Sequence, residues 1–237
     1  MENSPAVAQA RYWHLRQLGL FAGIAGAEVL ELGGQVETEL IEVGRHIYEF
    51  GDPADKVYVL KSGRVKISRA SDDGKELILY FVSPGEIFGE LAITGGECMD
   101  NSAVALEDVF FCAIPRALFE SFIQRHPEVS LRVVRVIGRR KERAEKRALD
   151  LITKDVRTRL AHTLAELSAD FGERDRRGVK IDLPLTQSEL AQIVGSTRET
   201  TSTIFNEFRR AGLVDSEGQT IWVLDRARLE EYSWLRP

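Results

Sequence analysis

A glycine-rich segment in the first half of the chain, FGELAITGGECMDNSAVA (Phe88–Ala105), has the residue types of a small-ligand pocket. Gly89 lets a ligand approach the backbone closely, and the Glu90 carboxylate can accept hydrogen bonds from ligand hydroxyl groups. No Lys or Arg lies between Glu76 and Pro115, whereas acidic residues recur through this span. A pocket built from this segment alone therefore lacks the cation that would bind a phosphate group.

A second candidate site lies in TQSELAQIVGSTRETTSTIFNEFRRAGL (Thr186–Leu213). Thr186–Glu189 and Ser196–Glu199 each have the pattern of a capping box, in which a hydroxyl and a glutamate bind free N–H groups at the start of a helix. The sequence thus predicts two short helices with a tight turn at Val194–Ser196 between them. This layout is typical of a helix-turn-helix, whose second helix enters the major groove of DNA.

The start of the second helix carries side chains that can read base edges. Arg198 can donate two hydrogen bonds to guanine, and Glu199 can accept one from the N4 amino group of cytosine. The following segment, LVDSEGQTIWVL, has a strand–turn–strand pattern and predicts a wing. Together these features indicate a winged helix-turn-helix domain that binds double-stranded DNA.

Composition limits the function further. The 237 residues are 43% apolar and 29% charged, as in a globular protein long enough for two domains. The net charge of −5 means that DNA binding must rest on local placement of basic residues. We expect a cytoplasmic protein with no membrane segment, because the chain shows no secretory signal and no long apolar run.

Motifs of enzymes and metal sites are missing from the sequence. It has no phosphate-binding GxxxxGK[ST] loop, no histidine pair at metal-binding spacing and no nucleophile elbow. Its two cysteines, Cys98 and Cys112, are too few for a zinc or iron–sulfur site. We therefore expect neither an enzyme nor a bound metal or cofactor.

The elements that position these sites are predicted from their patterns. Residues 44–115 consist of short β segments separated by turns, including Asp73–Gly74, and predict an antiparallel roll preceded by a helical segment at about Pro5–Leu32. The predicted fold class is α+β: an antiparallel β-roll, a long helix that would mediate dimerisation and a C-terminal winged helix-turn-helix. The corresponding domains are residues 1–126, 127–153 and 154–237.

Several helix boundaries can be predicted from single residues. Pro115 and Pro127 suit the first turns of two helices, and the second extends to about Ile152. Asp155 suits the N-cap of a further helix that ends near Gly172.

The long helix carries a mostly apolar seam at spacings of three and four residues, which is typical of a coiled-coil dimer. The alternative is a solvated face on an ordinary helix. The predicted interface residues are Val133, Ile137, Lys141, Ala144, Ala148 and Leu151.

Taken in order, the roll with its Phe-Gly-Glu-Leu motif, the long helix, IVGSTRETTSTIFNEFRRAGLV and the wing resemble one family. This is the family of the cyclic-AMP receptor protein and the fumarate–nitrate regulator, and the resemblance covers nearly the whole chain. It implies a homodimeric transcription regulator that binds palindromic DNA and carries its effector site in the roll.

The resemblance also implies which residues contact DNA. Family members have a second basic residue where this chain has Thr203, so a guanine contact is lost there or replaced by contact with a thymine methyl group. Glu199 could alternatively serve only to cap its own helix. The predicted base contacts are Arg198, Glu199, Ser202 and Thr203, and the predicted phosphate contacts are Gln187, Ser196 and Thr200.

In the cyclic-AMP-binding branch of the family, Phe-Gly-Glu-Leu is followed by Arg-Ser-Ala, whose arginine binds the cyclic phosphate. Here the arginine position holds Asn101, and the hydroxyl-bearing pair that meets adenine aligns with Ala144 and Glu145. We therefore expect that cyclic AMP is not the effector. The predicted pocket residues are Gly89, Glu90, Leu91, Asn101, Ser102, Lys141, Ala144 and Glu145.

Four alternatives for regulation follow. The pocket could bind another anion, such as a 2-oxo acid, through Arg140 or Lys141, or the protein could be active without an effector. Cys98 could be a redox switch, although its acidic neighbours disfavour the thiolate, whereas Cys112 reads as a core residue. Haem is the fourth, with candidate ligands His14, His46, His126, His162, Cys98 and Met99.

Two further interpretations concern partners. The charged loop 173–180 is a candidate contact for RNA polymerase, because the equivalent surface serves this role in the family. The competing function is a ligand-binding signalling module that responds to a cyclic nucleotide or another small molecule; a failure to bind any DNA would favour it.

Overall fold

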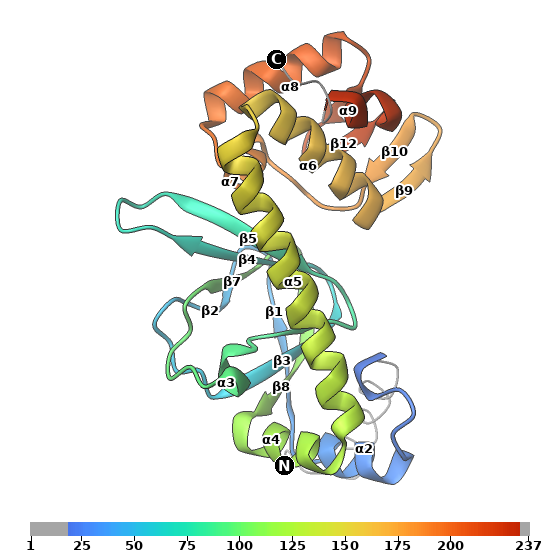
Figure 1. Cartoon of the computed structure of the whole chain (residues 1–237). Coiled ribbons are helices and arrows are strands. Elements are labelled where there is room, and N and C mark those ends of the chain that lie inside the picture. The colour runs from blue at the N-terminus through green and yellow to red at the C-terminus, as the bar shows by residue number, and fades with distance from the viewer. Residues whose placement is uncertain (1–18, 233–237) are drawn as a thin grey trace. The chain divides into compact units, whose positions relative to one another are not determined.

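The computed structural model describes residues 19–232, and within this range the chain forms two compact units (Figure 1). The first comprises residues 19–74 and Leu79–Glu142, and the second comprises Lys75–Ile78 and the residues from Arg143 onward. The α+β fold predicted from the sequence is confirmed: a β-rich N-terminal domain, a long helix, and a C-terminal helix-turn-helix with a small sheet. The first part of the predicted N-terminal helix, with His14, lies outside the described residues.

Two antiparallel four-stranded sheets form the roll. The first has the order β1 (Glu37–Ile41), β8 (Val109–Pro115), β3 (Lys56–Ser62) and β6 (Ile87–Phe88), and the second has the order β2 (His46–Tyr48), β7 (Ser102–Ala105), β4 (Val65–Ala70) and β5 (Glu76–Val82). The turn between β4 and β5 contains Asp73–Gly74, as predicted. Strand β1 precedes the predicted start of the roll; its sequence, ETELI, is largely solvent-exposed and lacks the apolar alternation that marks a strand.

Strands β3 and β8 separate two apolar cores, because successive side chains of a strand point to opposite faces of its sheet. One core lies between the sheets and includes Tyr58 and Phe111. The other includes Val57 and Cys112 and packs against helices. Cys112 is fully buried, as expected for a core residue.

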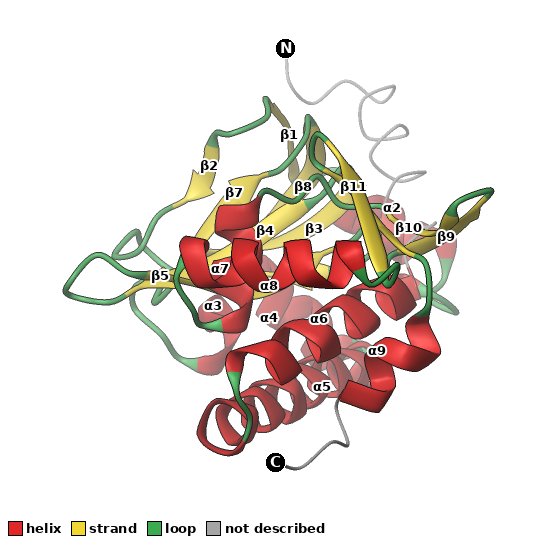
Figure 2. Ribbon diagram, turned by 90° about the horizontal axis from the view of Figure 1, so that it is seen from above, coloured by secondary structure: helices red, strands yellow, loops and turns green. Residues whose placement is uncertain are grey.

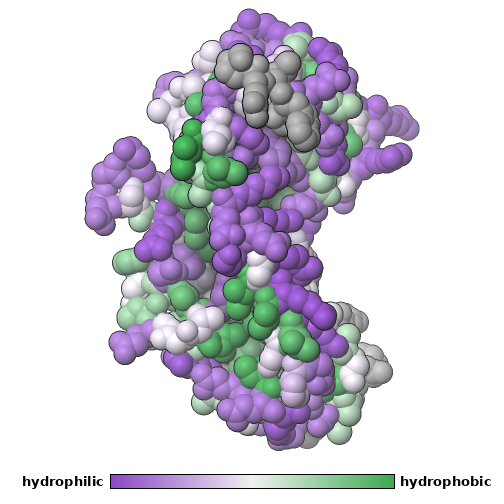
Figure 3. All heavy atoms as spheres, in the orientation of Figure 1, coloured by the Kyte–Doolittle hydropathy of each residue, from purple (hydrophilic) through white to green (hydrophobic). Residues whose placement is uncertain are grey.

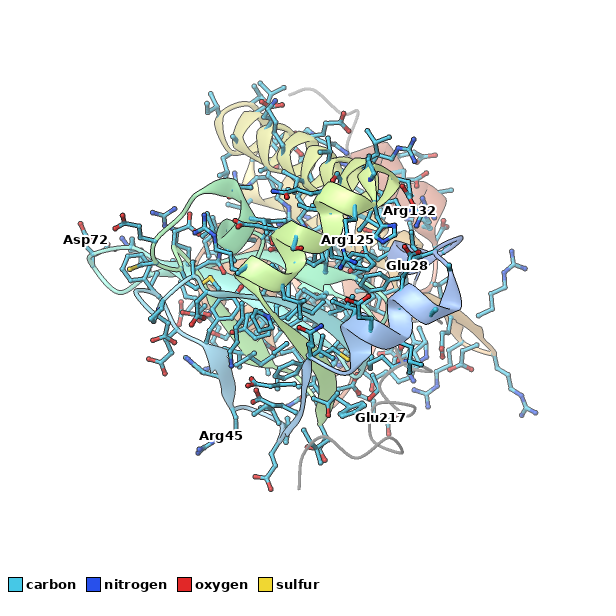
Figure 4. The ribbon with its side chains drawn as sticks, turned by 90° about the horizontal axis from the view of Figure 1, so that it is seen from below. Glu28, Arg45, Asp72, Arg125, Arg132 and Glu217 are labelled. Atoms are coloured by element: carbon cyan, nitrogen blue, oxygen red, sulfur yellow. The ribbon has the colours of Figure 1, made fainter. Side chains whose placement is uncertain are left out.

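Helices cover the outer face of the first sheet. They are the single turn Gly19–Phe21, α2 (Gly26–Gly33), α4 (Arg116–Arg125) and the first half of α5 (Pro127–Thr153); the short α3 (Leu91–Thr94) follows β6. Pro127 is the first residue of α5, as predicted, whereas Pro115 lies just before α4 as its N-cap. Polar contacts add to the packing: Arg132 donates a 2.8 Å hydrogen bond to the Leu20 carbonyl, on the same side of the unit as Glu28 (Figure 4).

The second unit contains helices α6 (Val156–Asp170), α7 (Gln187–Val194), α8 (Arg198–Arg210) and α9 (Arg226–Tyr232), which Figure 2 shows from above. Asp155 caps α6, as predicted, by accepting a 2.7 Å hydrogen bond from the Thr158 N–H. The small sheet has the strand order β11 (Val214–Glu217), β12 (Thr220–Val223), β10 (Gly178–Ile181) and β9 (Gly172–Asp175).

The expectation of a loop at 173–180 was wrong, since this segment forms the β9–β10 hairpin. Its charged residues lack apolar alternation and conceal the strand pattern. The pairing of β10 with β12 stabilises the hairpin instead.

Candidate nucleic-acid interface and effector site

Helices α7 and α8 are joined by a tight turn at Gly195. The backbone there is left-handed, with φ of 69°, a conformation that glycine adopts without strain. At the start of α7 the predicted capping box is confirmed: the Glu189 N–H donates to Thr186 Oγ1 at 3.1 Å, and Glu189 Oε2 accepts from the Thr186 N–H at 2.9 Å. The sequence motif thus fixes where the helix-turn-helix begins.

The second predicted capping box, at Ser196–Glu199, was wrong by one residue. The Ser196 N–H still bonds to the Ala191 carbonyl and so closes α7. Thr197 is therefore the first residue free to become the N-cap of α8, and its hydroxyl accepts a 3.2 Å hydrogen bond from the Thr200 N–H. Glu199 does not serve as a cap, and its carboxylate is exposed.

One face of α8 is buried and the opposite face is open. Thr201, Ile204, Phe205 and Phe208 pack inward. At 100° per residue, Glu199, Thr203, Asn206 and Arg210 fall on the opposite face, and all four are exposed. Arg198 is exposed beside this stripe, and Ser202 is half-buried. Asn206 was not predicted as a candidate, although its spacing of three from Thr203 could have revealed it.

The predicted phosphate-contact residues occupy different environments. Thr200 is exposed, and its hydroxyl accepts from the Thr197 hydroxyl at 3.0 Å. Ser196 and Gln187 are half-buried, and Gln187 Oε1 is fully buried with no hydrogen-bond partner among residues 19–232. Their contacts with DNA stay a prediction.

The wing and the β9–β10 hairpin share a polar link. Trp222 Nε1 donates a 2.8 Å hydrogen bond to Asp175, which lowers the pKa of that carboxyl. The Arg177 guanidinium lies 4.8 Å from the Trp222 ring centre and pairs with Glu217 at 3.0 Å. Arg174 and Arg176 are exposed on the same hairpin.

In the roll, Glu90 pairs with a basic residue from α5 of the same unit. Arg140 Nη1 lies 2.9 Å from Glu90 Oε2, and only 14% and 20% of the two side chains are exposed. The two groups form an ion pair, but the N–H bonds of Nη1 do not point at the carboxylate well enough to form a hydrogen bond with it. Arg140 Nη2 donates to the Ile87 carbonyl at 2.6 Å, which ties α5 to the strand before Glu90.

Tyr80 completes this cluster. Its ring centre lies 4.1 Å from the Arg140 guanidinium carbon, and its hydroxyl donates a 3.1 Å hydrogen bond to Glu90. Burial and the Glu90 charge raise the pKa of Tyr80 well above its usual value, so the phenol stays protonated. Burial acts to lower the pKa of the Arg140 guanidinium. Interactions with Tyr80 and Glu90 raise it by more than burial lowers it, so this pKa lies above its ordinary value. Glu90 is thus satisfied within the protein.

Asn101 and Ser102 are also engaged within the roll. The Asn101 amide oxygen accepts from the Tyr48 hydroxyl at 2.9 Å, and its nitrogen donates to Asp100 at 2.8 Å. Ser102 Oγ accepts from the Phe50 N–H at 3.0 Å. Asn101 therefore lies beside a phenol and a carboxylate, and that carboxylate is itself paired with Arg69 at 3.3 Å.

The remaining predicted pocket residues are dispersed. Gly89 has φ of 72° and is buried so close to the Tyr58 ring that a side chain would clash with it. Leu91 is half-buried at the start of α3. On α5, Lys141, Ala144 and Glu145 are exposed, whereas Arg140 is the residue that reaches Glu90.

The predicted dimer seam needs correction in its first half. Val133 is 4% exposed and packs, with Ile137, into the core formed by the chain's own roll. The same helix face is uncovered further on, where Lys141, Ala144, Ala148 and Leu151 are exposed. The exposed large apolar residues in the first half of α5 are Leu131 and Val134. Figure 3 shows that hydrophobic (green) patches also interrupt the hydrophilic surface of the molecule on the face it presents.

The candidate haem ligands do not form a set. Cys98 is exposed and Met99 buried, and His126 and His162 lie beside carboxylates. Among residues 19–232 no three side chains of His, Cys, Asp or Glu converge as a metal site. Within the same range no helix is long and apolar enough to cross a membrane.

The two units match two known domain families. Residues 39–126 match the cyclic nucleotide-binding domain, and residues 158–232 match the Crp-like helix-turn-helix domain. These two domains define a transcription regulator that binds DNA through a helix-turn-helix.

Relatives matched over most of the chain identify the family. A CRP-like cAMP-activated global transcriptional regulator of Mycobacterium tuberculosis is 33% identical over 91% of this chain and 96% of that protein. A global nitrogen regulator of Synechocystis is 29% identical over 84% of this chain and 91% of that protein. The chain belongs to the Crp/Fnr family of transcription regulators.

Structural comparison agrees. A CooA mutant from Carboxydothermus hydrogenoformans superimposes with a TM-score of 0.74 at 25% identity, covering 93% of this chain and 99% of that one.

Proposed function

We propose that this regulator binds palindromic promoter DNA as a homodimer and does so without cyclic AMP. The observation that carries the second part is the Arg140–Glu90–Tyr80 cluster, in which the acidic residue of the pocket is already bound by groups of the protein. A ribose hydroxyl would have to compete with these groups for Glu90.

The environment of Asn101 supports the same conclusion. An arginine at the phosphate position would contribute a charge-assisted hydrogen bond of about 1.5–3 kcal/mol to binding of a cyclic phosphate. Asn101 offers no charge, and its amide is bonded to Tyr48 and Asp100. The nearby cation, Arg69, is paired with Asp100 at 3.3 Å. Cyclic AMP therefore lacks the interaction that would anchor its phosphate.

A second candidate effector is a small anion other than a nucleotide. A small carboxylate could bind Arg140, but it would have to displace Glu90 and break a largely buried ion pair. We therefore favour a protein that is active without an effector.

For the dimer we propose a revised seam on α5. One face of α5 carries six exposed residues and the half-buried Gly138 at intervals of three and four residues. The exposed residues are Leu131, Val134, Lys141, Glu145, Leu149 and Ile152. Gly138 has free space at its Cα, which permits close approach of a second helix. The two-fold axis of such a dimer matches the symmetry of a palindrome.

The test is fluorescence anisotropy on three labelled duplexes at fixed salt: a palindrome obtained by in vitro selection, one half-site, and a scrambled sequence. We expect tight binding of the palindrome by a dimer and much weaker binding of the other two. Equal affinity for all three duplexes would refute sequence-specific binding, and equal affinity for one and two half-sites would refute the dimer.

A further inference from the structure

The outward stripe of α8 contains one side chain whose hydroxyl proton is already used. Thr203 Oγ1 donates a 2.9 Å hydrogen bond to the Glu199 carbonyl, one turn back in the same helix. Thr203 is exposed and lies on the face opposite the buried Ile204 and Phe208. It therefore points toward the groove when α8 binds DNA.

This hydrogen bond restricts what Thr203 can offer to a base. Its single O–H cannot donate to guanine N7 or O6, to adenine N7 or to thymine O4 while it bonds to Glu199. What remains is an oxygen that can accept and a methyl group. A threonine methyl group makes apolar contact with the C5-methyl group of thymine, a contact that no other base provides.

We infer that Thr203 reads a thymine in each half-site through its methyl group. The inference rests on DNA binding through α8 and extends it to the identity of one base. In the same half-site, Arg198 and Glu199 supply the polar contacts to guanine and cytosine. The preferred site therefore carries thymine where a basic residue at position 203 would select guanine.

The experiment removes the methyl group from the base and, separately, the methyl group or the hydroxyl from Thr203. Half-sites are first selected from random DNA by the wild-type protein, and thymine at each position is then replaced by deoxyuridine, which lacks only the C5-methyl group. We expect one replacement to weaken binding about fourfold, as for the loss of one buried methyl group.

Two variants assign that loss to Thr203. Thr203→Val keeps a methyl group and removes the hydroxyl, so the fourfold difference between thymine and deoxyuridine should persist. Thr203→Ser keeps the hydroxyl and removes the methyl group, so the difference should vanish. Thr200→Ser, three residues earlier on the same helix, is the matched control. It removes a methyl group but keeps the hydroxyl of the predicted phosphate contact, so it should leave the difference between thymine and deoxyuridine unchanged.

Three outcomes would overturn the inference: no deoxyuridine effect at any position, an effect that Thr203→Val abolishes while Thr203→Ser retains it, or an effect removed by Thr200→Ser instead. Failure of the wild-type protein to select any sequence is a different result, because it would contradict sequence-specific DNA binding itself.

Discussion

Arg140 and Glu90 form a largely buried ion pair with 2.9 Å between Nη1 and Oε2, inside the roll that the family uses for effectors. Both residues belong to the N-terminal unit, and Arg140 also binds the Ile87 carbonyl. The pair thus fastens the first half of α5 to the segment that would contact a ligand. Its consequences can be measured in stability and in DNA binding.

Breaking this pair from one side should be costly. Arg140→Met or Glu90→Gln leaves a partner without its counterpart, and we expect each to lower the free energy of unfolding by about 3 kcal/mol. The double variant should lose clearly less than the sum of the two. Urea unfolding at fixed protein concentration gives these values, and Arg139→Met, at the exposed neighbouring position, should change stability little. Additive losses would show that the two residues do not interact.

The revised dimer seam predicts where charges disrupt assembly. Leu131 and Val134 are 58% and 62% exposed, so glutamate at both positions leaves the fold intact. Each substitution counts twice in a symmetric dimer, and we expect the dimer dissociation constant to rise at least about 100-fold, or roughly 2.7 kcal/mol. Sedimentation equilibrium measures this constant. Leu40→Glu, on the exposed strand β1, is the control, and an equal effect there would contradict the α5 interface.

We expect substitutions in the β9–β10 hairpin to reduce transcription without reducing DNA affinity. We propose that Arg174 and Arg176 contact RNA polymerase, whereas Arg177 is held by Glu217 and Trp222. Charge reversal at Arg174 and Arg176 together should reduce transcription in vitro while DNA affinity stays within about twofold, since neither residue lies on α8. Unchanged transcription would exclude this surface, and a matching loss of DNA affinity would assign it to DNA instead.

We expect the charge of Asp150 to account for part of the stability that the second unit loses at acidic pH. Burial alone would raise the pKa of the Asp150 carboxyl, but hydrogen bonds from Lys154 and His162, each with an N–O distance of 2.9 Å, lower this pKa below its ordinary value. Because the folded pKa is below the unfolded one, this stabilisation is present above about pH 4 and is lost as the pH falls through the folded value.

The matching measurement uses Asp150→Asn. Its unfolding temperature should lie below that of the wild type at pH 7, and the two should converge as the pH falls below 4. A constant difference across this range would show that the charge of Asp150 does not contribute.

Much of the fold could be predicted because local signals were strong. The Thr186–Glu189 capping box, Pro127, Asp155 and the Asp73–Gly74 turn each specify an element through its own residues. The prediction at Ser196 was displaced because two adjacent hydroxyl residues can cap α8, and only the last hydrogen bond of α7 decides between them.

The candidate site was harder to predict because it depends on tertiary contacts. Val133 and Ile137 have the spacing of a dimer seam, yet the chain's own roll covers them. The sequence offered both Arg140 and Lys141 as cations for the pocket, and only the rotation of α5 against the roll selects Arg140. No pattern of neighbouring residues could have revealed that its partner would be Glu90.

The most direct test of the account is fluorescence anisotropy of the wild-type protein on its selected palindrome, at fixed salt, with and without millimolar cyclic AMP. We predict tight binding that cyclic AMP leaves unchanged, because Glu90 is bound to Arg140 and Asn101 provides no charge for the phosphate. Binding that appears only with cyclic AMP would contradict this account and would show that the nucleotide displaces Arg140 from Glu90.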